Sequence, residues 1–279
     1  MSFMQAIVKN AVLQMALLGA IGASFAGGLI GSYVVVKRIV SISGSIAHSV
    51  LSGMGAALYF QHLWGITWLT PLIGALVAAM ISALIIGWVH LRFQEREDAI
   101  IAMIWSIGMA IGVIFVSQIP GSGIELTHFL LGNILWVNTT DLALLASLDA
   151  VILVATLLLH KQFLSICFDE KQAKLQGINV AALYLFLLIL VGISVVVLIY
   201  IVGVILVLSM LALPASIAGA FTYRLSNMMV IAVLLNLTFS IGGLALSYHL
   251  DWPAGATIAL FSGCVYLLSL RFKRPSLLH

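Results

Sequence analysis

Residues 11–36 read AVLQMALLGAIGASFAGGLIGSYVVV, a stretch that contains no charged side chain. A helix of this length can cross the hydrocarbon core of a bilayer, which is about 30 Å thick. The stretch is too long for the apolar core of a secretory signal peptide, which spans roughly 7–15 residues. It therefore predicts a transmembrane helix.

The rest of the chain has the same apolar character. Hydrophobic residues make up 63% of the 279 residues and charged residues only 8%, whereas a soluble domain carries about 25% charged residues. The apolar residues form long blocks rather than the short alternating segments of a membrane β-barrel. We expect an all-α, polytopic membrane bundle that forms a single domain over residues 1–279.

Loops and charges divide the chain into nine expected spans, with eight as the alternative. The spans are residues 11–36, 39–61, 66–91, 99–118, 142–162, 180–201, 203–223, 228–248 and 254–271. A further apolar piece at residues 129–137 is too short to span, so we expect a re-entrant or interfacial helix there. Small residues recur four positions apart within the spans and indicate close helix packing; examples are Gly27/Gly31, Ser49/Gly53 and Gly108/Gly112.

Basic residues predict the orientation, because lysine and arginine concentrate in cytoplasmic loops. With nine spans, Lys9 is the one basic residue on its side of the membrane. The remainder share the opposite side: Lys37, Arg38, Arg92, Arg96, Lys161, Lys171, Lys174, Arg224, Arg271, Lys273 and Arg274. We therefore predict an N-terminus outside the cell and a C-terminus in the cytoplasm.

The second expected span carries an unusual polar stretch, SISGSIAHSVLSG, at residues 41–53. In a helix, Ser41, Ser45, His48 and Ser52 step by four, three and four positions, so they share one face. We call these four residues the polar stripe. Ionisable groups in spans usually face a bundle interior or an aqueous cavity, and a neutral imidazole binds zinc and other late transition metals. The stripe indicates either a translocation path or hydrogen bonds to neighbouring helices.

Several other polar residues are candidates for function. Asp149 lies within the fifth span, where an acid is costly, and is read either as a path residue or as an interfacial acid. Residues expected on the outer side are candidates for a metal entrance or for contact with a binding protein; they are His62, Glu125, His128, His249 and Asp251.

The longest charged loop on the predicted cytoplasmic side is FDEKQAKLQGINV, at residues 168–180. Acidic residues open it, helix formers follow, and Gly177 stands where a helix would stop. We expect a short surface helix there, either an ordinary connector or a docking element.

The order of acidic pair, alanine and glycine in this loop resembles the coupling segment of ABC importer permeases, where the membrane subunit contacts its ATPase. Four further stretches resemble the ABC-3 family of metal-ion permeases, with zinc permeases the most similar; they are residues 34–53, 129–142, 202–219 and 251–270. The resemblance assigns the coupling segment to residues 168–178 and identifies its ATPase-coupling residues as Asp169, Glu170, Ala173, Gln176 and Gly177.

The resemblance implies a bundle like that of type II ABC importers and a permease subunit for uptake of zinc, manganese or iron across a bacterial cytoplasmic membrane. The expected partners are an ABC ATPase, an extracytoplasmic metal-binding protein, a second permease copy in a homodimer and the lipid bilayer, with no nucleic acid. The metal is cargo, and no permanently bound cofactor is expected. Many members carry an aspartate three residues before the histidine; here that position is Ser45, which favours zinc over oxygen-preferring manganese.

The motifs of other functions are missing from the sequence. The chain contains no G-x-x-x-x-G-K-[ST] phosphate loop, so ATP hydrolysis belongs to a separate subunit and the chain itself is expected not to be an enzyme. H-E-x-x-H and G-x-S-x-G are also absent, which argues against an intramembrane protease. A permease for a metal chelate, of the siderophore or cobalamin type, and a stand-alone secondary transporter remain the alternatives.

Overall fold

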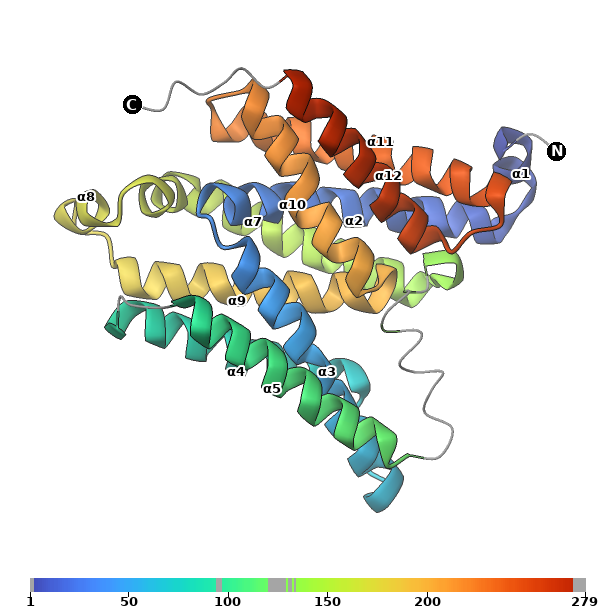
Figure 1. The fold of residues 1–279 in the computed structure, drawn as a ribbon, viewed down its shortest axis with the longest axis horizontal. Coiled ribbons are helices and arrows are strands. Elements are labelled where there is room, and N and C mark those ends of the chain that lie inside the picture. The colour runs from blue at the N-terminus through green and yellow to red at the C-terminus, as the bar shows by residue number, and fades with distance from the viewer. Residues whose placement is uncertain (1–2, 94–96, 120–128, 130–131, 133, 273–279) are drawn as a thin grey trace.

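The computed structural model describes residues 3–93, 97–119, 129, 132 and 134–272 (Figure 1). Nine long helices form the bundle within this part of the chain. They are α2 (Ala11–Val36), α3 (Val40–Trp64), α4 (Pro71–Phe93), α5 (Glu97–Ser117), α7 (Thr139–Phe168), α9 (Val180–Val202), α10 (Val204–Phe221), α11 (Leu225–Leu250) and α12 (Ala254–Ser269). The short elements are α1 (Phe3–Lys9), η1 (Ile134–Trp136), α8 (Glu170–Leu175) and η2 (Leu270–Phe272).

Each expected span corresponds to one long helix, which confirms the all-α polytopic fold. Seven of the described helices are both long and apolar enough to cross a membrane. The other two long helices do not meet both conditions. Helix α3 has 25 residues but is less apolar, because it carries the serines and histidine of the polar stripe, and α12 has only 16 residues. The largest difference in length is at α7, which runs from Thr139 to Phe168 rather than over 142–162.

Capping residues explain where α7 begins and ends. The Asn138 side chain accepts a hydrogen bond from the backbone N–H of Asp141 at 2.9 Å, and the Asp141 carboxylate accepts one from the backbone N–H of Asn138 at 3.0 Å. This reciprocal capping box satisfies two backbone donors at the start of the helix. At the other end, the chain turns at Asp169, whose extended backbone starts α8.

The helices form two groups joined by α9. In the larger group α2 packs against α7, α10 and α11, while α12 covers α10 and α11; in the smaller group α3 packs against α4 and α5. Helix α9 contacts both groups and is the most deeply buried part of the bundle. Figure 1 shows α1 and η1 at one end of the bundle and α8 at the other.

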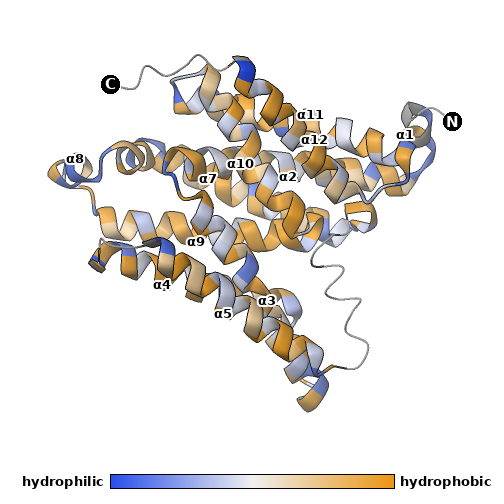
Figure 2. Ribbon diagram, viewed as in Figure 1, coloured by the Kyte–Doolittle hydropathy of each residue, from blue (hydrophilic) through white to orange (hydrophobic). Residues whose placement is uncertain are grey.

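Hydrophobic residues predominate along the lengths of the helices, and hydrophilic residues gather towards the ends of the bundle (Figure 2). Large apolar residues on the outer faces are well exposed; those on α7 include Val154, Leu157 and Leu158. A soluble protein rarely exposes so continuous an apolar surface. The surface matches the apolar interior of a bilayer, as expected for a polytopic membrane protein.

Small residues allow the close helix packing that the sequence predicts. A Cβ atom at Gly31 would lie 2.3 Å from the carbonyl oxygen of Leu211, and one at Gly108 would lie 2.6 Å from the Cα of Ser49. Both distances are shorter than van der Waals contact, so a larger residue would separate α2 from α10, or α5 from α3. The prediction of tight packing is confirmed at these positions.

The short helix expected at residues 129–137 is described only in part. Ile134–Trp136 form a single 3₁₀ turn, and the Trp136 side chain is exposed. Gly132 has a φ of +74°, and a Cβ atom there would lie 2.1 Å from the carbonyl oxygen of Val202. Glycine is therefore required where this segment rests on the corner between α9 and α10.

Candidate translocation path and coupling segment

The polar stripe lies along the contact between α3 and α5. Ser45 is fully buried and donates a hydrogen bond to the backbone carbonyl of Ile101 at 2.9 Å. The His48 ring stacks on the Trp105 ring, with centroids 4.4 Å apart and planes 9° from parallel. Part of the stripe therefore packs α3 against α5, as expected if its polar groups form hydrogen bonds to neighbouring helices.

The other stripe residues are more accessible. Ser41 is exposed, and His48 and Ser52 are half-buried. The Ser52 hydroxyl donates to the backbone carbonyl of Ser49 at 2.7 Å, while the buried Nδ1 atom of His48 has no hydrogen-bond partner within the described chain. The His48 Nδ1 atom is thus a buried polar atom of the stripe that the described chain leaves without a hydrogen bond.

A hollow of about 500 Å³ opens beside the stripe between α3, α4 and α5. Ser49, Ser52 and Ser82 contribute hydroxyls to its wall, and the Ser49 and Ser82 hydroxyls are 2.8 Å apart. The remaining lining residues are apolar or glycine, among them Gly53, Ile81 and Phe115. Ser52 is the stripe residue that lines this mostly apolar space, and the other hydroxyls in the lining come from Ser49 on α3 and Ser82 on α4.

Asp149 belongs to a different pair of helices. It lies on α7 opposite α2, and a Cβ atom at Gly22 of α2 would lie 3.3 Å from its carboxylate Oδ2. Its Oδ1 atom is buried and lacks a hydrogen-bond partner among the described residues. The structure thus brings Asp149 against α2 rather than against the α3–α5 contact that holds the polar stripe.

The outer candidates that the structure describes lie at the ends of two different helices. His62 is exposed near the end of α3, and His249 and Asp251 are exposed at the end of α11. Asp251 ends α11 in the left-handed conformation, with a φ of +55°. Glu125 and His128 lie outside the described residues.

Sequence reasoning did not single out a cavity of about 290 Å³ near the start of α7. Met54, Trp136, Asp141 and Tyr200 are among its lining residues, and they come from four separate elements. Asp141 is the charged residue in this lining, and its charge is the feature of the sequence that could have pointed to the cavity. The other contributors are ordinary span or loop residues that only the fold brings together.

The expected coupling segment forms the short helix α8 at the end of the bundle opposite α1. The Asp169 carboxylate accepts hydrogen bonds from the backbone N–H groups of Lys171 and Gln172, at 2.8 and 3.0 Å. Gly177 follows the helix with a φ of +79°, and a Cβ atom there would meet open space. The two caps make α8 a defined element rather than an irregular connector.

One face of α8 packs inward and the other is open. Ala173 is completely buried, whereas Gln176 is exposed and Leu175 is 88% exposed. Phe168, which precedes the helix, is 69% exposed. Ala173 therefore seats α8 on the bundle, while Phe168, Leu175 and Gln176 are accessible to a partner.

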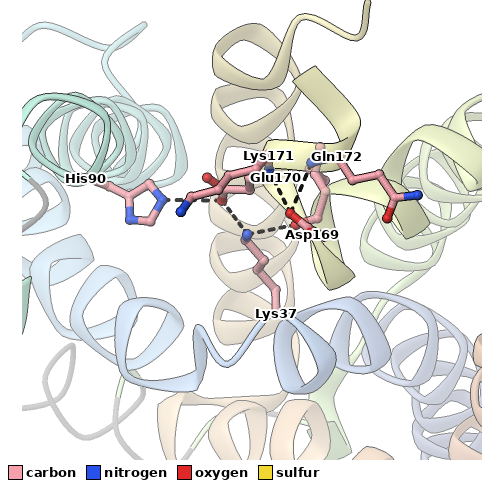
Figure 3. A network of polar contacts seen from close by, with 7 residues as sticks. Lys37, His90, Asp169, Glu170, Lys171 and Gln172 are labelled. Carbon is pink, nitrogen blue, oxygen red and sulfur yellow. Dashed lines mark hydrogen bonds and ion pairs between the residues drawn. The ribbon is translucent and has the colours of Figure 1, made fainter. Parts of the chain in front are cut away.

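Glu170 connects α8 to two other helices through a cluster that the sequence did not reveal (Figure 3). Its carboxylate accepts a hydrogen bond from the ammonium group of Lys37, which also donates to the carbonyl of Ile166 at 2.8 Å. The Nε2 atom of His90, on α4, lies 3.4 Å from the same carboxylate oxygen. We call Lys37, His90 and Glu170 the clasp.

Opposing effects act on the Glu170 carboxyl group. Partial burial raises its pKa. The hydrogen bond and positive charge of Lys37, together with His90, have a larger effect in the opposite direction, so the pKa of Glu170 is below the usual range. Glu170 is therefore ionised in the clasp at neutral pH. The Lys37 ammonium also lies 5.6 Å from the centre of the Tyr184 ring, a cation–π contact.

The fold is that of a multi-pass helical membrane protein. Membrane-length helices surround a partly polar helix contact, and the capped helix α8 is seated at one end of the bundle with one face exposed. The family model described as "ABC 3 transport family" matches residues 9–273. The chain belongs to this family.

Individual relatives cover nearly the whole chain. A "Probable metal transport system membrane protein" of Chlamydia trachomatis serovar D is 52% identical over 92% of this chain and 88% of the relative. The "Manganese transport system membrane protein MntC" of Halalkalibacterium halodurans is 29% identical over 97% of this chain and 90% of its own length. The solved structure "PsaBC from Streptococcus pneumoniae in complex with Fab" has a chain that is 29% identical, with a TM-score of 0.83 and coverage of 96% and 94%.

Proposed function

We propose that this chain is the permease subunit of an ATP-driven importer of a divalent transition-metal ion in a bacterial cytoplasmic membrane. The observation that carries the proposal is His48, whose Nδ1 atom has no hydrogen-bond partner among the described residues, on the same helix face as Ser52, which lines a mostly apolar hollow, in a chain of the ABC 3 family. The metal-transport names of the relatives support the same cargo class.

In this proposal His48 is a transient ligand rather than part of a closed cage. A transport path needs weak binding, because a site that holds the ion tightly does not release it. Hydroxyls such as Ser52 hold the water molecules of a partly hydrated ion. A second copy of the chain, packed as a homodimer beside the α3–α5 contact, completes the walls of the path.

Zinc is the proposed cargo, with manganese as the second candidate. Ser45 uses its hydroxyl for the bond to Ile101, so the nitrogen of His48 is the main donor of the stripe, and imidazole suits zinc better than manganese. Manganese is favoured by a different observation, the name of the Halalkalibacterium relative.

The ATPase docks at α8, and an extracytoplasmic metal-binding protein delivers the ion at the opposite end. The accessible Phe168, Leu175 and Gln176 support this assignment of α8, and Asp169 and Gly177 hold it in shape. We expect Gly177→Val to reduce coupled uptake, because a β-branched residue is strained at positive φ. Gly177→Asn is the matched control, since asparagine tolerates that conformation.

The test is uptake of radioactive zinc and manganese into proteoliposomes that contain the permease, its ATPase and the binding protein. We expect ATP-dependent zinc uptake, with a clear loss in His48→Ala and a greater loss in His48→Leu, which also fills the path. Expression and assembly with the ATPase should stay near normal in both variants. If His48→Ala transports both ions at the unmodified rate, His48 is not a path ligand.

A further inference from the structure

The clasp links α8 to the corner between α2 and α3. Lys37 ends α2, and Arg38 turns the chain with a φ of +62° before α3 begins at Val40. A residue other than glycine rarely adopts such a φ, so the corner has a defined and tight geometry. Glu170 therefore forms its ion pair with a residue that lies three positions before the start of α3, the helix that carries His48.

The clasp is shielded from water to an unusual degree for a charged surface cluster. The exposed fractions of the side chains are 11% for Lys37, 22% for His90 and 33% for Glu170. Water and salt screen such a pair less than an exposed pair. Removing one partner leaves the other charge unpaired in a partly dehydrated position. The clasp is therefore a specific contact that holds α8 to the end of α2 and to α4.

Glu170 is not needed to form α8 itself. Asp169 caps the helix, and Ala173 anchors it against the bundle. The carboxylate of Glu170 points away from the exposed face of α8, towards Lys37 and His90 (Figure 3). Its contacts thus lie between helices of this chain rather than on the accessible docking face.

Helix α3 is in close backbone contact with both α4 and α5. A Cβ atom at Gly53 of α3 would lie 2.0 Å from the carbonyl oxygen of Gly74 on α4, and one at Gly112 of α5 would lie 2.6 Å from the backbone of Leu51 on α3. Backbones packed this closely slide or rotate as a unit rather than deform individually. A displacement of α8 that is transmitted through Lys37 and His90 would therefore move α3 and α4 at the same time.

We propose that Glu170 is the coupling residue that transmits movement of α8 to the α2–α3 corner and to α4, and so to the polar stripe. The proposal rests on the proposed function, in which the ATPase docks at α8. Glu170 acts through Lys37 and His90 and does not contact the cargo. It is a positioning residue for transport, separate from the residues of α8 that touch the ATPase.

The experiment compares Glu170→Gln with the unmodified chain in the complete transporter reconstituted in liposomes. Three quantities are measured: ATPase retained on the purified permease, ATP hydrolysed, and zinc or manganese ions moved per ATP. We expect normal retention and continued hydrolysis in Glu170→Gln, with the number of ions moved per ATP reduced about tenfold, within the range typical of coupling between sites. His90→Gln should give a smaller reduction, because Lys37 still holds Glu170.

Two further variants separate coupling from general damage. The charge swap Lys37→Glu with Glu170→Lys should recover part of the lost coupling, which is expected only if the loss arises from this ion pair and not from damage elsewhere. Lys161→Gln is the matched control, since it removes an exposed charge near the end of α7 without touching the clasp.

The outcomes distinguish the clasp from the proposed function. If the unmodified chain retains no ATPase and shows no ATP-dependent uptake, the proposed function fails. If the unmodified chain couples normally and Glu170→Gln moves as many ions per ATP, the clasp proposal is overturned. It is also overturned if Glu170→Gln releases the ATPase, because Glu170 would then be a docking contact.

Discussion

At the scale of single residues, the polar stripe shows how one helix face can serve two purposes. Ser45 and His48 are one turn apart, yet Ser45 binds the backbone of α5 and His48 keeps a nitrogen without a partner. Buried polar groups are normally satisfied, so an orphaned imidazole nitrogen calls for an explanation. Transient binding of a cargo ion supplies one.

We predict that Ser45→Asp lowers thermal stability. The substitution removes the hydroxyl that donates to Ile101 and places an acceptor against that carbonyl oxygen, at a cost of about 1–3 kcal/mol. A bound divalent ion would offset part of this cost by neutralising the carboxylate. Thermal unfolding in detergent, with and without zinc, measures both effects. A Ser45→Asp variant as stable as the unmodified chain in the absence of metal would contradict the buried hydrogen bond.

The Glu170 carboxylate makes a pH-dependent contribution to stability. Its pKa is lower in the folded protein than in the unfolded chain, because Lys37 and His90 outweigh the effect of burial. The contribution is therefore fully present above the ordinary glutamate pKa of about 4.3 and is lost as pH falls through the lower folded value. We expect the difference in Tm between the unmodified chain and Glu170→Gln to shrink as the pH falls below about 4.3, because the stabilising carboxylate then becomes protonated. A difference that grows as pH falls would contradict the ionised clasp.

At the scale of helices, α10 contains a proline that a neighbour compensates. Pro214 has no N–H, so the carbonyl of Met210 one turn earlier loses its usual helical donor. The buried side-chain amide of Asn236, on α11, donates to that carbonyl at 3.0 Å. A polar residue inside an apolar span is thus explained by the backbone of another helix.

We predict that Asn236→Leu destabilises the bundle by about 1–3 kcal/mol, because it leaves the Met210 carbonyl unsatisfied in an apolar setting. The double variant Asn236→Leu with Pro214→Ala restores an N–H to α10 and should recover part of the loss. Denaturation of the purified protein compares the three chains. Equal stability of the single and double variants would show that the carbonyl is not the cause.

At the scale of the whole molecule, the bundle has two ends of different character. Helix α8 and the basic residues Lys37, Lys171 and Lys174 lie at one end, while α1 and the short η1 turn lie at the other (Figure 1). Lysine and arginine are retained on the cytoplasmic side during membrane insertion. The α8 end is therefore the predicted cytoplasmic face.

We predict that the two termini lie on opposite sides of the membrane. Single cysteines at Ser2 and Ser276 are introduced into a chain whose Cys167 and Cys264 have been replaced. A membrane-impermeant thiol reagent should label Ser2→Cys in intact cells with a permeable outer envelope and label Ser276→Cys only after the cytoplasmic membrane is opened. Labelling of both positions from the same side would contradict nine spans.

The sequence by itself determined the membrane class, the positions of the nine helices and the caps of α8. These features depend on local properties: the length of an apolar block, the mean hydropathy and the residues at helix ends. Only the tertiary structure decided which polar groups meet. Lys37 and Glu170 are 133 positions apart, Ser45 and Ile101 are 56 apart, and Asp149 faces α2 rather than the polar stripe. The physical reason is that a helix in a bilayer is apolar on every side, so its pattern does not indicate which face meets which neighbour; close packing of small residues and a few buried hydrogen bonds make that choice.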